Sequence, residues 1–286
     1  MRIKITADST CDLSKELCQR YNIVILPLHV VKGGESFDDG VTIFPQDVYE
    51  YFESGAGMCA TAAVNIQEYA EFFRAQRKDC DAIIHINIST GFSSCHQNAL
   101  LAAQEVDGVY PVDSKNLSTG SGLVVIKACE LAQEGKAPEE IVAALADYVK
   151  LVEASFVVDK LDYLHKGGRC SAVAALGASV LQLKPCIEVR GGKMQVGKKY
   201  RGKLERCIQG YVADRLRDRS DIDSRRIFIT DSSAMPEIEQ KVEDAIRSVM
   251  DFDEILHTRA GCTVSSHCGP STLGILFVRK AGSEEV

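Results

Sequence analysis

The stretch AIIHINISTGFSSCHQNALLAAQEV, residues 82–106, decides the fold. Residues 82–88 form a mostly apolar run with the length of a buried strand, and a hydroxyl-rich turn follows directly. From about Ser93 to Val106 the spacing of the apolar residues predicts a helix. A strand that is apolar on both faces and leads into a helix indicates a parallel sheet covered by helices on both sides.

The first half of the chain repeats this alternation of strands and helices. Further strand-like runs lie at 2–7, 23–31 and 108–113. Helical patterns lie after Asp12 and near 45–53, 66–78, 119–134 and 138–152. Ligands of such sheets bind at the carboxyl ends of the strands, so the turns after the strands are the first candidates for a site.

The second half of the chain has a different pattern. The segment KPCIEVRGGKMQVGKKY, residues 184–200, contains two strand-like runs joined through Gly191 and Gly192, which is a hairpin signal. Later strands are expected at 226–230, 253–259 and 274–279, and helices at 203–217 and 236–249. This order of elements predicts antiparallel pairing.

Together these patterns predict an α/β protein of two domains with a ligand between them. Residues 1–152 are expected to form an N-terminal domain with a mainly parallel sheet flanked by helices. Residues 153–286 are expected to form a C-terminal domain with a mixed or antiparallel sheet and helices. Because no flexible linker separates them, the domains should pack firmly and leave a cleft at their junction.

The composition is that of an ordinary soluble globule, with 45% hydrophobic and 26% charged residues in a chain of 286. The longest apolar runs are much shorter than the ~20 residues of a membrane-spanning helix, and the first ten residues lack the apolar core of a signal peptide. Eleven cysteines, an odd number without a CxxC pair, favour reduced thiols. We therefore expect a cytoplasmic protein without an integral membrane segment.

The formal charge of −7 argues against nucleic-acid binding, which needs a basic surface. The segment from Lys184 to Arg226 is the exception, with thirteen Lys and Arg against six Asp and Glu. It is either a solvated face or a docking surface for an acidic partner or a phosphorylated ligand.

No metal site is expected, because the close group Cys262, His267 and Cys268 lacks a fourth ligand nearby.

Three polar turns follow the strands of the first half: DSTCDLS at 8–14, STGFSSCH at 89–96 and DSKNLSTGSG at 113–122. Each lies where a helix begins, and Ser, Thr and Asp side chains there satisfy free N–H groups of the helix. The same geometry directs backbone N–H groups and partial positive charge at the cleft, where they bind anions. Capping and anion binding are compatible here.

Two catalytic interpretations of these residues were weighed. Ser93, Cys95 and His96 have the side chains of a nucleophile and its base, but GFSSC lacks the second glycine of a nucleophile elbow. A phosphate-binding P-loop is excluded because no G-x-x-x-x-G-K-[ST] occurs. His267 is expected in a loop, beside Ser266 and a Gly-Pro turn, where it can donate to an anion.

The motifs taken in order resemble the DegV family of bacterial fatty acid-binding proteins, along nearly the whole chain. They are DSTCDLS (8–14), FDDG (37–40), STGFSSCHQNA (89–99), VDSKNLSTGSG (112–122), LDYLHKGGRCS (161–171), LQLKPCIEV (181–189), KKYRGK (198–203) and SHCGPSTLG (266–274). The resemblance implies a protein that holds one long-chain fatty acid, with its carboxylate at the domain junction and its tail buried. It also implies a separate kinase subunit that carries ATP and Mg²⁺ and forms acyl-phosphate for phospholipid metabolism, so this chain is expected to be neither an enzyme nor the carrier of an intrinsic cofactor.

The resemblance also assigns residues by motif position. Thr61, Ser93 and His267 are implied as hydrogen-bond donors to the carboxylate. Arg169 and Arg201 are implied as basic residues on the head-group or partner side. Four more residues are kept as supporting candidates: Ser9, Ser94, His96 and Ser266.

This chain departs from the family pattern at three places. It has TAAVN at 61–65 where the family has Thr-Ser-Gln-Pro-Ser, FSSCH at 92–96 where Leu-Ser-Gly-Thr-Tyr-Gln is usual, and GPS at 269–271 in place of GPG. The alternatives to fatty acid binding are therefore a Ser/Cys–His acyl hydrolase, or a binder of a different small carboxylate or phosphate ligand.

Overall fold

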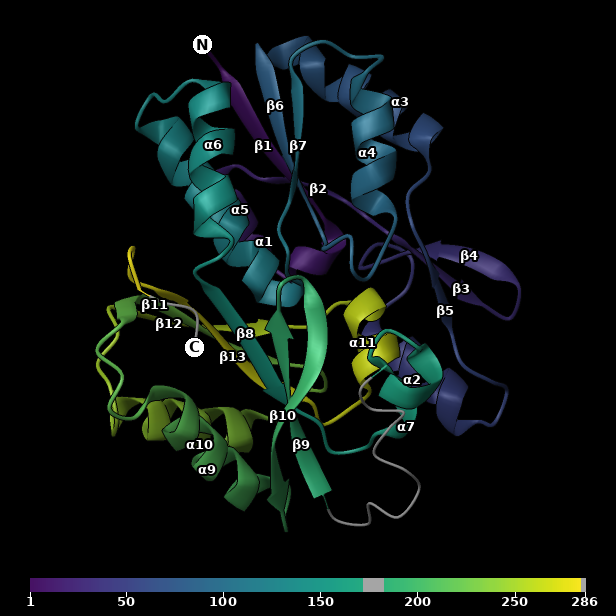
Figure 1. Cartoon of the computed structure of the whole chain (residues 1–286). Helices are drawn as coiled ribbons and strands as arrows, with labels where there is room; N and C mark the ends of the chain where they lie inside the picture. The colour runs from purple at the N-terminus through teal and green to yellow at the C-terminus, as the bar shows by residue number, and fades with distance from the viewer. Residues whose placement is uncertain (172–182, 284–286) are drawn as a thin grey trace.

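The computed structural model describes residues 1–171 and 183–283, so the first two residues of the 181–189 motif and the last three of the chain lie outside it. The described chain folds into three sheets with helices packed around and between them (Figure 1). It is the α/β architecture expected from the sequence, with a parallel sheet in the first half and a mixed sheet in the second.

The first sheet is parallel, with four strands in the spatial order β2 (Val24–Leu26), β1 (Ile3–Asp8), β6 (Ala82–Asn87) and β7 (Val109–Asp113). All six residues of β6 are buried, as a central parallel strand requires. The helices of this half are α1 (Lys15–Tyr21), α3 (Ile66–Gln76), α4 (Cys95–Ala103), α5 (Ser118–Gln133) and α6 (Pro138–Tyr148), with short 3₁₀ turns η1 (Ser9–Cys11) and η2 (Arg77–Asp79). Helices α5 and α6 lie on one side of the sheet and α3 and α4 on the other (Figure 1).

The second sheet has six strands in the spatial order β10 (Lys193–Arg201), β9 (Leu183–Arg190), β8 (Val152–Val157), β13 (Leu273–Arg279), β11 (Ile222–Asp231) and β12 (Glu254–Arg259). Its pairs are antiparallel except for β11 and β12, which are parallel. The predicted hairpin is β9–β10, with Gly191 and Gly192 at its tip in the left-handed region. Helices α9 (Leu204–Leu216) and α10 (Pro236–Arg247) pack together beside this sheet, and side chains from both form a core with its strands.

A third, small antiparallel sheet was not predicted. Its strands are β4 (Glu35–Asp38), β3 (His29–Lys32) and β5 (Ala60–Ala62), and three helices lie near it: α2 (Pro45–Glu53), α7 (Asp162–Gly167) and α11 (Cys262–Cys268). The run 23–31, predicted as one strand, is divided between β2 of the first sheet and β3 of this one. Pro27 lies between them, and proline cannot donate to a sheet ladder, so the prediction of a single strand was wrong.

Two further expectations need correction. His267 does not lie in a loop, because residues Cys262–Cys268 form α11, whose first N–H groups are satisfied by buried carboxylates. The helix predicted over 138–152 ends at Tyr148, and Val152 instead begins β8, where it pairs with Val278.

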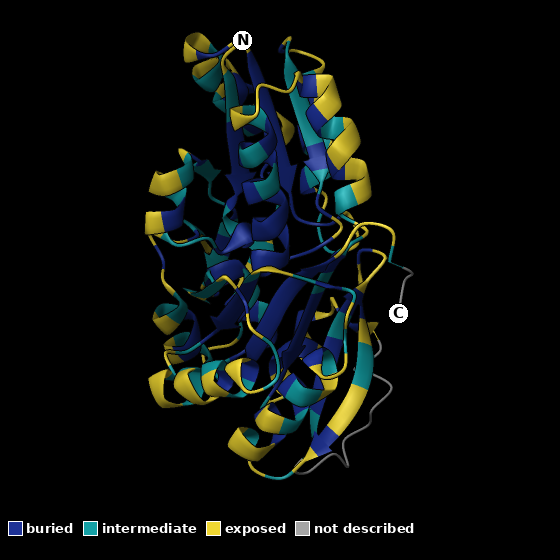
Figure 2. Cartoon of the chain, turned by 90° about the vertical axis from the view of Figure 1, so that its left-hand side faces the viewer, coloured by how far each residue is buried: buried dark blue, intermediate teal, exposed yellow. Residues whose placement is uncertain are grey.

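The core runs across the junction of the two halves. Helix α5 contacts the parallel sheet through β1 and β6 and the six-stranded sheet through β8 and β13. One apolar cluster accordingly includes Ile5 and Ile84 of the first sheet with Phe156 and Leu276 of the second. Figure 2 shows the central strands of the two large sheets buried, and the outer faces of the helices exposed. The edge strands β10 and β12 are more exposed. The division at residue 152 stays a prediction; β8, a strand of the second sheet, begins there.

Two general findings complete the fold. Within the described ranges, no helix is both long and apolar enough to cross a membrane. Ten of the eleven cysteines are buried, and these ten pack in the apolar clusters as small core residues.

Candidate functional site

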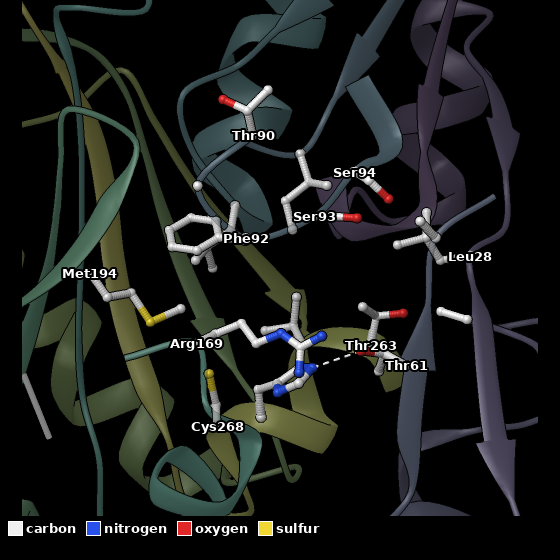
Figure 3. Close-up of a pocket in the computed structure, with 17 residues that line it drawn as sticks. Leu28, Thr61, Thr90, Phe92, Ser93, Ser94, Arg169, Met194, Thr263 and Cys268 are labelled. Carbon is white, nitrogen blue, oxygen red and sulfur yellow. Dashed lines mark hydrogen bonds between the residues drawn. The ribbon is translucent and has the colours of Figure 1, made fainter. Parts of the chain in front are cut away.

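A cavity of about 470 Å³ lies between the parallel sheet, the small sheet and the β9–β10 hairpin. Its wall is made by residues from both halves of the chain: Leu28, Thr61, Ala62, Ala63, Ile88, Thr90, Gly91, Phe92, Ser93, Ser94, Leu117, Arg169, Met194, Thr263, Val264, His267 and Cys268. Figure 3 shows these side chains around the open space. Most of the wall is apolar, and the polar groups come from the turn after β6, from β5, from α11 and from Arg169.

The structure brings Thr61 and His267 into direct contact. Thr61 lies on β5, opposite Val30 of β3, and His267 lies in the last turn of α11. Thr61 Oγ1 and His267 Nε2 are 2.8 Å apart, the bond drawn as a dashed line in Figure 3. The two residues are 206 positions apart in the sequence, so the contact ties the small sheet of the first half to a helix of the second.

His267 is held in its neutral form. Burial lowers the pKa of His267 to about 4, and the positive charge of Arg169 acts in the same direction, against a smaller opposite effect of the Gly167 backbone. A neutral imidazole has one donor and one acceptor nitrogen. It can therefore accept the Thr61 proton or donate to Thr61 Oγ1, and in the second case the Thr61 hydroxyl is free to donate to a ligand.

Gly167 and Arg169 complete this side of the cavity. A Cβ on Gly167 would lie 2.5 Å from His267 Nδ1, so only glycine leaves room for the imidazole here. Arg169 Nη1 donates to Gly167 O at 2.9 Å, and in Figure 3 the side chain reaches toward the Thr61–His267 bond. Among residues 1–171 and 183–283, Arg169 has no carboxylate within ion-pair distance, so its charge is available to an anion.

Ser93 lies in the turn between β6 and α4. Its hydroxyl accepts from Cys95 N at 3.3 Å and donates to Cys95 Sγ at 3.1 Å, so it caps the start of α4 while its proton points at a weak acceptor. A carboxylate oxygen is a much stronger acceptor than a thiol. The serine can therefore turn its proton to a ligand at little cost. Ser94 and Thr90 line the same wall.

The other sequence-derived candidates lie elsewhere. Ser9 donates to Asp39, and Ser266 donates to Cys262 O inside α11. His96 contacts Asn87 Oδ1 through Nδ1 at 3.3 Å. None of these three side chains is in the cavity wall, so the structure does not bring them to Thr61, Ser93 and His267.

Arg201 is separated from Arg169. It is exposed at the far end of β10, paired with Leu183, whereas Met194 near the start of the same strand lines the cavity. Seven residues of extended strand span on the order of 20 Å. Of the two basic residues implied by the resemblance, Arg169 lies at the cavity and Arg201 on the outer surface.

The geometry does not assemble a nucleophile with its base. Within the described residues, no hydrogen bond joins Ser93 to His96, and burial raises the pKa of the Cys95 thiol to about 11. At neutral pH that thiol is protonated and unreactive. In the same described ranges, no group of three or more His, Cys, Asp or Glu side chains is placed to hold a metal ion.

The apolar wall continues toward the interior. A second void of about 30 Å³ shares Leu117, Val264 and Cys268 with the cavity. Its other walls include Phe156 and Leu276 of the six-stranded sheet. The small void therefore lies next to the cavity, on the side of the six-stranded sheet.

Most of the wall residues are not among the candidates from the sequence, and three of them matter for the site. Phe92 and Met194 face the cavity from the β6–α4 turn and from the hairpin, and Thr263 faces it from α11. Apolar residues such as Phe92 and Met194 carry no sequence signal that separates a cavity wall from a core. Thr263 lies four residues before His267, and this spacing places both on one face of a helix. In the loop that the sequence predicts here, the same spacing carries no such meaning.

The chain matches the family model of the DegV family of uncharacterised proteins over residues 2–280. It is 30% identical over 282 residues to a DegV domain-containing protein of Caldanaerobacter subterraneus subsp. tengcongensis, and the match covers 98% of this chain and 99% of the relative. The fold matches a DegV family protein from Thermus thermophilus, described as fatty acid binding, with a TM-score of 0.87, 28% identity and coverage of 98% of this chain and 100% of that one.

Two more solved structures extend the comparison. DegV of Bacillus subtilis, described as a fatty acid binding protein, matches with a TM-score of 0.81 and 25% identity, covering 98% of this chain and 100% of that one. A stearic acid-binding protein from Eubacterium ventriosum matches with a TM-score of 0.83 and 25% identity, covering 97% and 98%. The likeness spans both halves of the chain.

Proposed function

Because this chain belongs to the DegV family, we propose that it binds one long-chain fatty acid in the cavity between its two halves. The carboxylate lies at Thr61, Ser93 and His267, beside Arg169, and the tail runs along the apolar wall past Leu117 toward the six-stranded sheet. The observation that carries the proposal is a neutral histidine and hydroxyl groups in the wall of a largely apolar cavity, with a small apolar void next to it. Three relatives of similar structure are themselves described as fatty acid-binding.

The energetics of such a ligand fit this arrangement. Each buried CH₂ group gains ~0.8 kcal/mol, so a tail of about sixteen carbons supplies on the order of 10 kcal/mol of gross driving force. An unpaired carboxylate costs several kcal/mol to bury. The tail therefore provides affinity, and the hydroxyls of Thr61 and Ser93 set the position and orientation of the head group.

The same geometry suits transfer of the acid to an enzyme. Hydroxyl donors stabilise the carboxylate without holding both of its oxygens in a rigid salt bridge, so one oxygen stays free to attack a phosphoryl group. The chain has no P-loop, and we propose that a separate kinase subunit carrying ATP and Mg²⁺ supplies that group in the cytoplasm. The carboxylate oxygen forms a bond to the γ-phosphorus, the bond to the leaving ADP oxygen breaks, and acyl-phosphate results.

Organic extraction of the denatured protein tests fatty acid binding. Purified protein is unfolded, extracted and analysed by mass spectrometry, with the protein quantified in parallel. We expect one equivalent of a C14 to C18 fatty acid per chain. A polar phosphorylated ligand, or no lipid even after incubation with excess hexadecanoic acid, would reject the proposal in favour of another small anion.

Charge reversal of Arg201 tests the partner-facing role of the basic surface. Arg201→Glu should leave the dissociation constant for hexadecanoic acid within about twofold, because Arg201 lies on the outer surface away from the cavity. It should lower the rate of acyl-phosphate formation by a kinase subunit at least tenfold. Lys78→Glu, an exposed charge reversal on the first half, is the control. An equal loss of binding and transfer by Arg201→Glu would contradict the assignment.

A further inference from the structure

We propose that Thr263 is a further hydrogen-bond donor to the head group of the ligand. This inference rests on the proposed function and adds a residue that the sequence motifs do not assign. Thr263 lies in the first turn of α11, is 5% exposed and lines the cavity together with Thr61 and His267. In Figure 3 Thr263 and Thr61 lie on the same side of the open space.

The part of the chain that the structure describes does not satisfy the hydroxyl of Thr263. Among the described residues, Thr263 Oγ1 is buried and has no hydrogen-bond partner. A buried hydroxyl without a partner costs on the order of 1–3 kcal/mol, and most such groups in proteins are paired. Because Thr263 lines the cavity, a ligand bound there can supply the acceptor.

The neighbouring hydroxyls of α11 show that this is a feature of Thr263 itself. Ser265 Oγ donates to Ala260 O, and Ser266 Oγ donates to Cys262 O at 2.8 Å. Both use carbonyls of the preceding turn, as Ser and Thr commonly do in helices. Thr263 makes no such bond, so its hydroxyl is left for a group outside the helix.

Buried carboxylates fix the position of Thr263. Asp39, the second acid of the FDDG motif, accepts from Cys262 N at 2.7 Å and from Thr263 N at 3.0 Å. Asp12 accepts from Gly261 N at 2.8 Å. Both acids belong to the first half of the chain, so they hold the start of α11 against it. Since Thr263 and His267 are four residues apart on this helix, the same contacts orient both toward the cavity.

The chemistry of the head group leaves room for another donor. An ionised carboxylate has about four acceptor sites. Thr61 and Ser93 can each fill one of them, and an added neutral donor lowers the cost of burial without adding a charge. An ester or an alcohol offers a weaker acceptor, so the contribution of Thr263 should depend on the head group and not on the tail.

Matched ligands and matched variants test this inference. Thr263→Val removes the hydroxyl and keeps the shape, whereas Thr263→Ser keeps the hydroxyl. Dissociation constants are measured for hexadecanoic acid and for hexadecan-1-ol with wild type and both variants. Thr119→Val is the control, because Thr119 is fully buried, donates to or accepts from Thr230, and lies outside the cavity.

Thr263→Val should weaken binding of the acid about tenfold and binding of the alcohol less than threefold, and Thr263→Ser should restore binding of the acid. Thr119→Val should leave the ratio of the two dissociation constants unchanged. If Thr263→Val weakens acid and alcohol equally, or neither, the donor role is rejected while fatty acid binding stands. If wild type binds neither ligand, the proposed function itself fails.

Discussion

Two groups of hydroxyl side chains in this protein differ in how far the fold itself satisfies them. The group at the start of α5 is saturated within the fold: Ser114 pairs with Ser121 at 2.8 Å, Ser118 donates to Asp12 at 2.6 Å, and Thr119 pairs with Thr230 at 2.6 Å. Around the cavity, Thr61 contacts a neutral histidine and Ser93 contacts a thiol, and Thr263 Oγ1 has no hydrogen-bond partner among the described residues.

This difference distinguishes a polar turn that stabilises the fold from a polar turn that binds a ligand. Both DSKNLSTGSG and STGFSSCH follow a parallel strand and begin a helix, and both contain the residues that cap helices. In the first, the fold itself supplies the partners: Ser121 and Asp12 belong to the first half of the chain, and Thr230 belongs to the second. In the second, Ser89 and Thr90 donate to Gly192 O and Asp113 within the fold. Ser93 lines the cavity and donates only to a thiol, which a ligand can replace as the acceptor. Substitutions in the first group should therefore cost stability, and substitutions in the second should cost binding.

Asp12→Ala should give the largest effect on the structural group. Asp12 is buried, accepts from Ser118 Oγ and Gly261 N, and has a left-handed backbone that alanine adopts poorly. We expect the free energy of unfolding to fall by about 3 kcal/mol, measured by urea denaturation. Asp12→Asn keeps an oxygen acceptor and tolerates the backbone, so its loss should be clearly smaller. Equal losses for the two variants would show that hydrogen bonding to Asp12 is unimportant.

His267→Gln should change how stability depends on pH. The pKa of His267 is lowered to about 4 in the fold, so between pH 6.5 and 4 the unfolded state binds more protons and acidification destabilises the wild type. From pH 7 to 4.5 this contribution is about 2 kcal/mol, and it should be absent in the variant. The raised pKa of Asp8, about 6, acts with the opposite sign but is common to both proteins. An identical pH dependence in both would place the His267 pKa near its ordinary value.

The double variant Thr61→Ala, Ser93→Ala tests the binding group. It should weaken binding of hexadecanoic acid at least tenfold, which corresponds to about 1.4 kcal/mol, and leave the free energy of unfolding within about 1 kcal/mol. Isothermal titration and urea denaturation measure the two quantities. Ser114→Ala with Ser121→Ala is the matched control from the α5 group, and we expect the reverse result for it. Unchanged binding in the Thr61 and Ser93 double variant would remove both from the site.

Ser271→Gly should give the smallest effect, on stability alone. Ser271 stands where the family usually has glycine, yet its backbone keeps the left-handed conformation with φ of 57°. Glycine removes the steric cost of that conformation and adds chain entropy to the unfolded state, so we expect a net gain of about 0.5 kcal/mol. Thermal and urea unfolding detect such a change. A loss of stability would mean that the serine side chain contributes more than its backbone costs.

The parallel sheet could be predicted because its signal is local. Residues 82–88 form a mostly apolar run, which is typical of a strand covered on both faces. In the helix after it, the apolar residues recur at the spacing of an amphipathic helix. The small sheet could not be predicted, since β3 and β5 are three or four residues long and pair only through the tertiary fold. Pro27 was the available signal for the break between β2 and β3.

The site residues were predicted from their positions in family motifs more than from the chemistry of the residues themselves. Thr61, Ser93 and His267 were identified by motif position, and the structure places all three in the wall of one cavity. Ser9, His96 and Ser266 have the same side-chain chemistry, but neighbouring groups already satisfy them. A sequence shows which residues carry hydrogen-bond donors, but it does not show the distances between donors and acceptors. It therefore cannot distinguish a hydroxyl that has a partner within the fold from one, such as that of Thr263, that has none among the described residues.

A crystal structure of the protein with hexadecanoic acid tests the central claim most directly. The account predicts that the carboxylate lies within hydrogen-bond distance of Thr61 Oγ1 and Ser93 Oγ, with the tail passing Leu117 and Val264 into the space between the two large sheets. A carboxylate bound at the outer surface near Arg201, or a tail that lies outside the cavity, would contradict it.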